Sequence, residues 1–154
     1  MSANALHDLA ELLPTSEEIE RYRQCGYYIS KPLYTEAELD AAIAASERYY
    51  DELQGREIAL PNGRTYSLAW HPGDGPERLR KNDYSTLVVP ELNALLRKPA
   101  LGLIAALLCG DDVRLWHDQL LYKPPSSDDA PQSVGWHTDY GYWRTCSADN
   151  MLTA

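Results

Sequence analysis

Residues 134–143 read VGWHTDYGYW and place His137 and Asp139 two positions apart among aromatic side chains. In an extended strand, residues i and i+2 project to the same face, so this imidazole and this carboxylate can converge on one point. A histidine and a carboxylate are two of the three ligands in the facial triad that holds non-haem Fe(II). The spacing alone fits a surface histidine hydrogen-bonded to a neighbouring aspartate equally well, because so short a pattern also arises by chance. The surrounding sequence has to separate the two interpretations.

Two further runs flank this pair. Residues 114–125 read RLWHDQLLYKPP, and residues 151–154 read MLTA. With the segment 135–143 between them, they resemble the phytanoyl-CoA dioxygenase family, whose members are Fe(II)- and 2-oxoglutarate-dependent oxygenases built on a double-stranded β-helix, a cupin-like jelly roll. The resemblance also takes in residues 22–39, which look like the family's opening helix, Gly-Tyr strand and second helix. It is loose between residues 56 and 90.

The resemblance implies a metal site and a set of cosubstrate contacts. His137 and Asp139 would be two ligands of Fe(II), with 2-oxoglutarate and O2 as cosubstrates and ascorbate as a supporting reductant. The positions that match Gln119 and Leu121 line the cosubstrate pocket in this family, and the position that matches Thr153 offers a hydroxyl to 2-oxoglutarate. Related halogenases have a small residue where this chain has an aspartate. The expected reaction is therefore hydroxylation or desaturation of a small-molecule substrate.

The chain departs from the family in its second half. The family places a second histidine ligand, and an arginine for the far carboxylate of 2-oxoglutarate, well after the first pair. No histidine follows His137, and Arg144 is too close to the pair to match that arginine. The sequence stops at Ala154, where only about two of the eight β-helix strands are visible. We therefore expect the N-terminal part of a longer enzyme, and we expect residues 1–154 alone to hold iron weakly and not to turn over.

Two other classes of protein remain open. A non-catalytic jelly-roll protein would bind a small molecule in the same pocket without needing Fe(II). A zinc hydrolase using His137 and Asp139 would need a third ligand and a general base. Aromatic side chains just after the pair can wall a substrate pocket above a metal or simply pack in a core: Tyr140, Tyr142 and Trp143.

Other candidate groups have simpler interpretations. His117 and Asp118 are adjacent, so on a strand they point to opposite faces and cannot chelate one ion. We expect His117 to be a hydrogen-bonded sheet residue. His71 lies beside a proline in a predicted loop and is not expected to be a ligand. The basic run at 78–81 could meet an anionic substrate, such as a carboxylate or a CoA phosphate, but also fits a solvated loop.

Composition bounds the class of protein. The chain has 154 residues, which predicts one domain, and 44% are hydrophobic, which is enough for a core. A net charge of −9 argues against nucleic acid and anionic membrane surfaces as partners. Three cysteines without metal-ligand spacing predict free thiols in a reducing compartment. With no signal peptide and no apolar run long enough to span a bilayer, we expect a cytoplasmic protein. Its oligomeric state is not encoded in any pattern.

Local signals predict an α+β chain, with N-terminal helices packed on the first strands of the jelly roll. Capping boxes, glycines and hydrophobic periodicity indicate the following elements: a disordered leader over 1–14, a helix over 15–24 ended by Gly26, a short strand over 27–30, a helix over 35–55 with a buried stripe at Leu39, Ala42, Ile43, Ser46 and Tyr50, a hairpin about Asn62-Gly63, a loop over 70–83, a helical segment over 90–108 broken at Lys98-Pro99, and strands over 113–123 and 134–143 that face each other.

Overall fold

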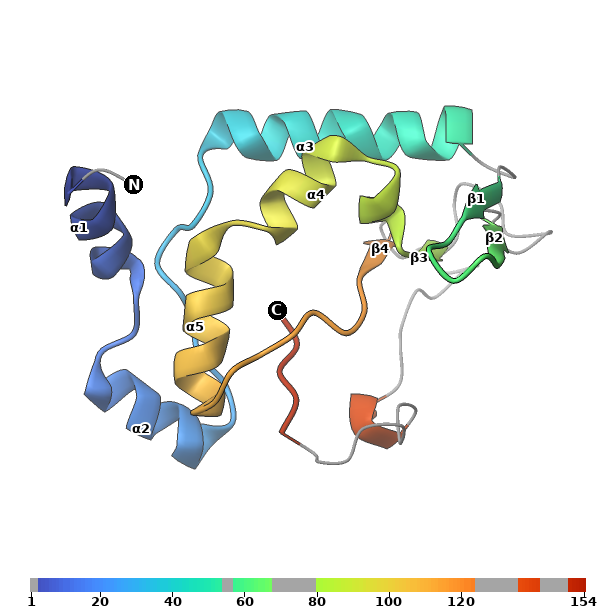
Figure 1. Cartoon of the computed structure of the whole chain (residues 1–154). Coiled ribbons are helices and arrows are strands. Elements are labelled where there is room, and N and C mark those ends of the chain that lie inside the picture. Colours follow the sequence, from blue (N-terminus) through green and yellow to red (C-terminus); the bar gives the residue numbers. More distant parts are fainter. Residues whose placement is uncertain (1–2, 54–56, 68–79, 124–135, 142–149) are drawn as a thin grey trace, which may run out of the picture. The chain divides into compact units, whose positions relative to one another are not determined.

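A computed structural model describes residues 3–53, 57–67, 80–123, 136–141 and 150–154 (Figure 1). The chain divides into two compact units, each described here by itself. The first comprises residues 1–35, 96–114 and 137–154; the second comprises residues 36–95 and 115–136. Helices and short antiparallel strands together confirm the α+β class. The elements of the described residues are α1 (Ala3–Leu12), α2 (Ser16–Cys25), α3 (Glu36–Arg48), η1 (Tyr49–Leu53), β1 (Glu57–Ala59), β2 (Thr65–Ser67), β3 (Arg80–Asp83), η2 (Ser85–Leu87), α4 (Pro90–Leu96), α5 (Pro99–Cys109), β4 (Gln119–Tyr122) and η3 (Asp139–Gly141).

The start of α2 is the best-predicted feature of the first unit. The backbone N–H of Glu18 donates to Thr15 Oγ1 at 3.2 Å, and the Thr15 N–H donates to Glu18 Oε2 at 2.7 Å, which completes the expected capping box. The Thr15 N–H, and after it the Thr15 hydroxyl, which donates to Glu18 Oε2 at 3.0 Å, lower the pKa of the Glu18 carboxyl. Gly26 ends the helix at φ 79°, a left-handed conformation that glycine adopts without strain.

Two expectations for the N-terminal region are wrong. Residues 3–12, predicted to be a disordered leader, form α1, because alanine and leucine favour a helix even where no capping signal precedes them. Residues 27–30, predicted to be a strand, have no strand partner in the described part of the chain, and Ile29 is exposed. Aromatic and β-branched residues favour a strand, but a segment becomes one only where another strand pairs with it.

Helix α5 follows the predicted break in the helical segment. Pro99 occupies its first turn, Gly110 ends it at φ 75°, and its buried face repeats every four residues at Ala100, Ile104 and Leu108. The described stretch Pro90–Cys109 is long and apolar enough to cross a membrane. It consists of two helices separated at Arg97 and Lys98, so its length and composition are weak evidence for a membrane span.

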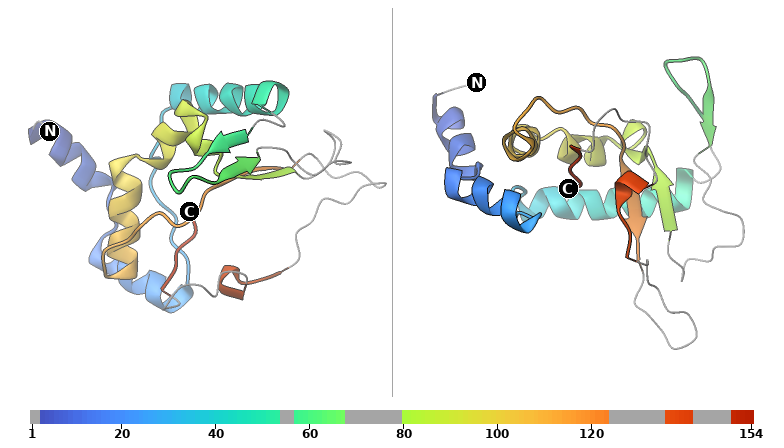
Figure 2. Two further views of the ribbon diagram at one scale, coloured as in Figure 1. Left: turned by 45° about the vertical axis from the view of Figure 1, so that its right-hand side comes forward. Right: turned by 90° about the horizontal axis from the view of Figure 1, so that it is seen from below.

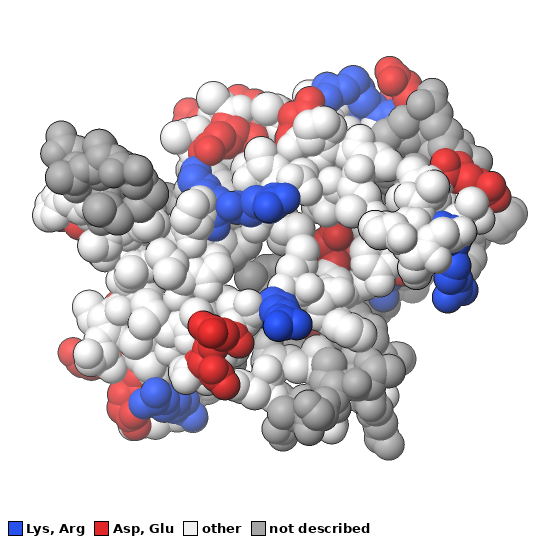
Figure 3. Space-filling view, in the orientation of Figure 1, with Lys and Arg blue, Asp and Glu red and all other residues white. Residues whose placement is uncertain are grey.

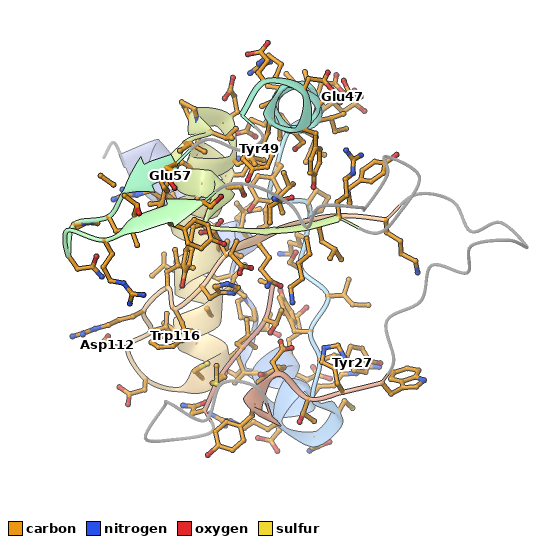
Figure 4. All side chains as sticks on the ribbon, turned by 90° about the vertical axis from the view of Figure 1, so that its right-hand side faces the viewer. Tyr27, Glu47, Tyr49, Glu57, Asp112 and Trp116 are labelled. Atoms are coloured by element: carbon orange, nitrogen blue, oxygen red, sulfur yellow. The ribbon has the colours of Figure 1, made fainter. Side chains whose placement is uncertain are left out.

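The second unit has a core of tyrosines beneath α3. Tyr49, which begins the π-helical turn η1, is 1% exposed and packs in a cluster with Ala45, Tyr50 and Val89. Figure 4 shows Tyr49 between α3 and the β1–β2 hairpin, with Glu47 on the outer side of the helix. Burial, as the largest cause, raises the pKa of both Tyr49 and Tyr50 to about 12. The expected burial of Tyr50 is confirmed.

The predicted buried stripe on α3 is only partly correct. Ala42 and Tyr50 are buried, but Leu39 and Ile43 are exposed, and the buried face instead runs through Ala42 and Ala45. The prediction placed Leu39 and Ile43 in the buried stripe because they are the larger aliphatic side chains of the helix. The volume of this core comes from the tyrosines just after α3, so small alanines suffice on the helix itself.

Two separate two-stranded sheets lie in this unit (Figure 2). The hairpin about Asn62-Gly63 is confirmed: β1 pairs antiparallel with β2, from Glu57 opposite Ser67 to Ala59 opposite Thr65. The second sheet corrects three expectations. Residues 80–83, predicted to lie in a loop, form β3. The long strand over 113–123 is regular only in β4, and β4 pairs with β3 rather than with residues 136–141, the described part of the predicted second strand. Strand partners distant in sequence leave no local signal.

Candidate metal site

His137 lies on the loop just before the short turn η3, and Asp139 is the first residue of that turn, so neither lies on the predicted strand. The backbone N–H of Gly141 donates to the Thr138 carbonyl at 3.0 Å and closes this turn. His137 Nε2 nevertheless lies 3.4 Å from Asp139 Oδ1. The pair converges because the chain turns here, and the argument from alternating strand faces does not apply.

The geometry of this pair fits two ligands of one ion. Nitrogen and oxygen ligands lie about 2.1 Å from a first-row metal, so two neighbouring ligands are separated by about 3.0 Å at a right angle and about 3.4 Å at a tetrahedral angle. The His137 and Asp139 side chains are 39% and 35% exposed, so an ion from solvent can reach both. The same separation also falls at the long limit of a hydrogen bond. No third His, Cys, Asp or Glu joins the pair among the described residues.

Thr153 is the third predicted site residue that the structure brings to this place. Its Oγ1 donates a hydrogen bond to Asp139 Oδ2 at 2.7 Å. The two oxygens of the Asp139 carboxylate are therefore divided, with Oδ1 toward His137 and Oδ2 toward Thr153. The segment that carries Thr153 is held to the end of α5, since Asn150 Nδ2 donates to the carbonyl of Cys109 at 3.2 Å.

Gln119 and Leu121, the other predicted cosubstrate contacts, belong to β4 in the second unit. Both side chains are exposed, and Gln119 Nε2 donates to Asp83 Oδ1 at 2.7 Å. They stand two positions apart on the strand and so share one face of the β3–β4 ladder. Their contact with a cosubstrate stays a prediction.

Asp83 is a polar centre that sequence reasoning missed. Its Oδ1 also lies 3.2 Å from Nε2 of His117, whose side chain is only 12% exposed. The ring of Tyr84 stands edge-on to the His117 ring, with centroids 5.1 Å apart. Asp83 is 34 positions from His117 and 36 from Gln119 in the sequence, so no local pattern could have revealed these contacts before β3 was known to pair with β4.

His117 behaves as expected in its bonding. Its side chain turns to Asp83, whereas its neighbour Asp118 accepts hydrogen bonds from the N–H of Thr86 at 3.3 Å and from Thr86 Oγ1 at 3.0 Å. The two adjacent side chains therefore bond to different partners. His117 lies just before β4 and not within it.

The remaining candidates are only partly covered by the described residues. Tyr140 is exposed on η3. Tyr142 and Trp143, the other two proposed pocket residues, lie outside the described residues, as do His71 and Cys146. The two described cysteines, Cys25 and Cys109, are free thiols as expected, and burial raises the pKa of Cys109.

Of the basic run at 78–81, the structure describes Arg80 and Lys81. Arg80 lies on β3 and is not a solvated loop residue. Its guanidinium carbon lies 3.9 Å from the ring centroid of Tyr50 and 4.3 Å from that of Tyr122. Such cation–π contacts are typical of arginine, whose planar group stacks on aromatic rings.

Acidic and basic side chains are interspersed over the face drawn in Figure 3.

No protein-family model matches the chain, and neither a curated protein nor a solved structure matches it. The family resemblance therefore remains a prediction carried by the motif residues. What the structure adds is the geometry of one exposed histidine–aspartate pair and the threonine bonded to it.

Proposed function

We propose that this chain contributes His137 and Asp139 to the iron site of an Fe(II)- and 2-oxoglutarate-dependent dioxygenase that hydroxylates a small-molecule substrate. The observation that carries the proposal is that the two residues matched to the family's ligands by the sequence resemblance lie together in a solvent-accessible turn, with His137 Nε2 3.4 Å from Asp139 Oδ1. The proposal includes the double-stranded β-helix as the fold to which these elements belong.

Each residue then has a defined task. The His137 imidazole would supply Nε2 as a nitrogen ligand, and the Asp139 carboxylate would supply a negative charge that offsets the charge of the cation. Fe(II) with bound 2-oxoglutarate, when present, supplies the activation of O2 that breaks a C–H bond. Tyr140 stands next to Asp139, where an aromatic ring can limit the access of water and orient a substrate. Gln119 and Leu121 are the proposed cosubstrate contacts.

A non-catalytic binding protein is the second candidate. It is favoured by the finding that the described residues supply two ligands and no third. Such a protein would bind its small molecule equally well in the absence of metal. A complete facial triad needs three protein ligands, so we expect residues 1–154 to bind divalent metal weakly through two side chains.

Anaerobic titration with Co(II), a spectroscopic substitute for Fe(II), tests the proposal. We expect His137→Ala and Asp139→Asn each to weaken binding by about tenfold or more, because each removes one of two ligands. The His7–Glu11 pair provides a matched control: its Nε2–Oε1 distance is 3.5 Å, and both side chains are exposed on α1. His7→Ala should leave the Co(II) affinity unchanged.

Two outcomes would count against the proposal. If His137→Ala and His7→Ala had the same affinity as the unchanged chain, the pair would be an ordinary surface contact. A small-molecule ligand that bound identically with and without divalent metal, and identically to Asp139→Asn, would favour the non-catalytic protein.

A further inference from the structure

The hydroxyl of Thr153 is bonded to a proposed metal ligand, and this contact defines a role that differs from contact with 2-oxoglutarate. We propose that Thr153 is a positioning residue for Asp139: it holds Oδ2 away from the metal and leaves Oδ1 to bind. The inference rests on the proposed function, because it requires that Asp139 bind metal. Its evidence is separate, namely the 2.7 Å hydrogen bond from Thr153 Oγ1 to Asp139 Oδ2.

The division of the carboxylate oxygens carries this inference. The terminal torsion of an aspartate is broad, so a carboxylate on an exposed turn rotates readily about its Cβ–Cγ bond. A short hydrogen bond from a hydroxyl to a charged oxygen is among the stronger polar contacts in proteins. With Oδ2 bonded to Thr153, the plane of the carboxylate is held so that Oδ1 lies 3.4 Å from His137 Nε2. The two metal-binding atoms are thus prearranged before an ion arrives.

The position of Thr153 is itself supported. Asn150 ties the segment to the carbonyl of Cys109 at the end of α5, and Met151 and Leu152 are half-buried between these two polar contacts. Thr153 therefore approaches Asp139 from a segment fixed at its other end. Partners that hydrogen-bond to metal-binding carboxylates orient them, and their removal commonly costs tenfold to a hundredfold in metal affinity.

Substitution of Thr153 tests the inference through metal affinity, without any need for turnover. Thr153→Val replaces the hydroxyl by a methyl group of similar volume, whereas Thr153→Ser keeps the hydroxyl. We expect Thr153→Val to weaken Co(II) binding by about tenfold at constant pH and Thr153→Ser to restore it to within about twofold. Thr65→Val, on the exposed strand β2, is the matched control and should have no effect. Circular dichroism should show all variants to be equally folded.

The outcomes separate the inference from the proposed function. If Asp139→Asn weakens Co(II) binding but Thr153→Val does not, the positioning role is wrong and the metal site stands. If Thr153→Val binds Co(II) normally but the cobalt-loaded variant binds 2-oxoglutarate less tightly, Thr153 contacts the cosubstrate and the inference is again overturned. Failure of the unchanged chain to bind Co(II) at all would overturn both proposals together.

Discussion

Among the residues that the structure describes, two histidine–aspartate pairs have nearly equal lengths but different surroundings. His137 Nε2 lies 3.4 Å from Asp139 Oδ1 in the first unit, and His117 Nε2 lies 3.2 Å from Asp83 Oδ1 in the second. In the first pair, both side chains are more than a third exposed, whereas the His117 side chain is 12% exposed. Distance alone therefore cannot separate a metal site from a structural contact.

The partners of each carboxylate make the distinction. Asp83 Oδ1 already accepts the Gln119 amide at 2.7 Å, and the β3–β4 ladder fixes both residues. An ion at this pair would have to displace a good hydrogen bond. At Asp139, the good hydrogen bond is made by Oδ2, and Oδ1 faces His137 with only a long contact. We infer that the second pair stabilises a sheet, whereas an ion bound at the first would leave the hydrogen bond between Asp139 and Thr153 intact.

The unit that contains the His117–Asp83 pair should be the more sensitive to alkali. Tyr49 and Tyr50 have pKa values raised from 10.0 to about 12, chiefly by burial, so the folded state keeps protons that the unfolded state releases. This stability is complete below pH 10 and is lost as pH rises through about 12, by on the order of 2 kcal/mol for each tyrosine. Urea unfolding of this unit, followed by circular dichroism across this range, measures the loss.

The matched variant for this prediction is Tyr49→Phe with Tyr50→Phe, which keeps both rings and removes both ionisable groups. Its urea midpoint should fall much less between pH 10 and 12 than that of the unchanged chain. An equal fall in both proteins would assign the alkaline sensitivity to other groups.

Of the two carboxylates, the one that is not a proposed metal ligand, Asp83, should contribute more to the free energy of unfolding than Asp139. Asp83→Ala takes away a partner shared by His117 and Gln119, and we expect a cost of about 1–3 kcal/mol in the free energy of unfolding. Asp139→Ala, on an exposed turn, should change stability by no more than about 0.5 kcal/mol. Urea unfolding without metal compares the two. A larger loss for Asp139→Ala would mean that its contacts serve the fold rather than a ligand.

The features that could be read from the sequence are those encoded within a few residues. The capping box at Thr15, the glycine at the end of α2 and the Asn62-Gly63 turn each depend on neighbours one to four positions away. The pairing of β3 with β4 joins segments about 40 residues apart and was missed. Asp83 was missed for the same reason, since its role exists only after that pairing forms.

The candidate site shows the same limit in another form. The proximity of His137 and Asp139 was expected from a strand, but a turn produces it. Side chains two positions apart can meet in more than one backbone conformation, so a correct pair of residues does not confirm the predicted element. Thr153 was singled out through family resemblance alone, and its bond to Asp139 could not be read from a separation of 14 residues.

The smallest predicted effect concerns Tyr84, which follows Asp83 and has a positive φ of 58°. Its ring contacts both His117 and Tyr66, with the Tyr66 centroid 5.4 Å away, and such aromatic pairs contribute about 0.5–1.5 kcal/mol. Both Tyr84→Asn and Tyr84→Val lose these contacts. Asparagine tolerates the left-handed conformation, whereas β-branched valine does not. We therefore expect Tyr84→Val to be the less stable variant by about 1 kcal/mol, although valine is the more apolar residue. Equal urea midpoints, or a more stable valine variant, would mean that the rings alone and not the backbone conformation hold this corner beside the His117–Asp83 pair.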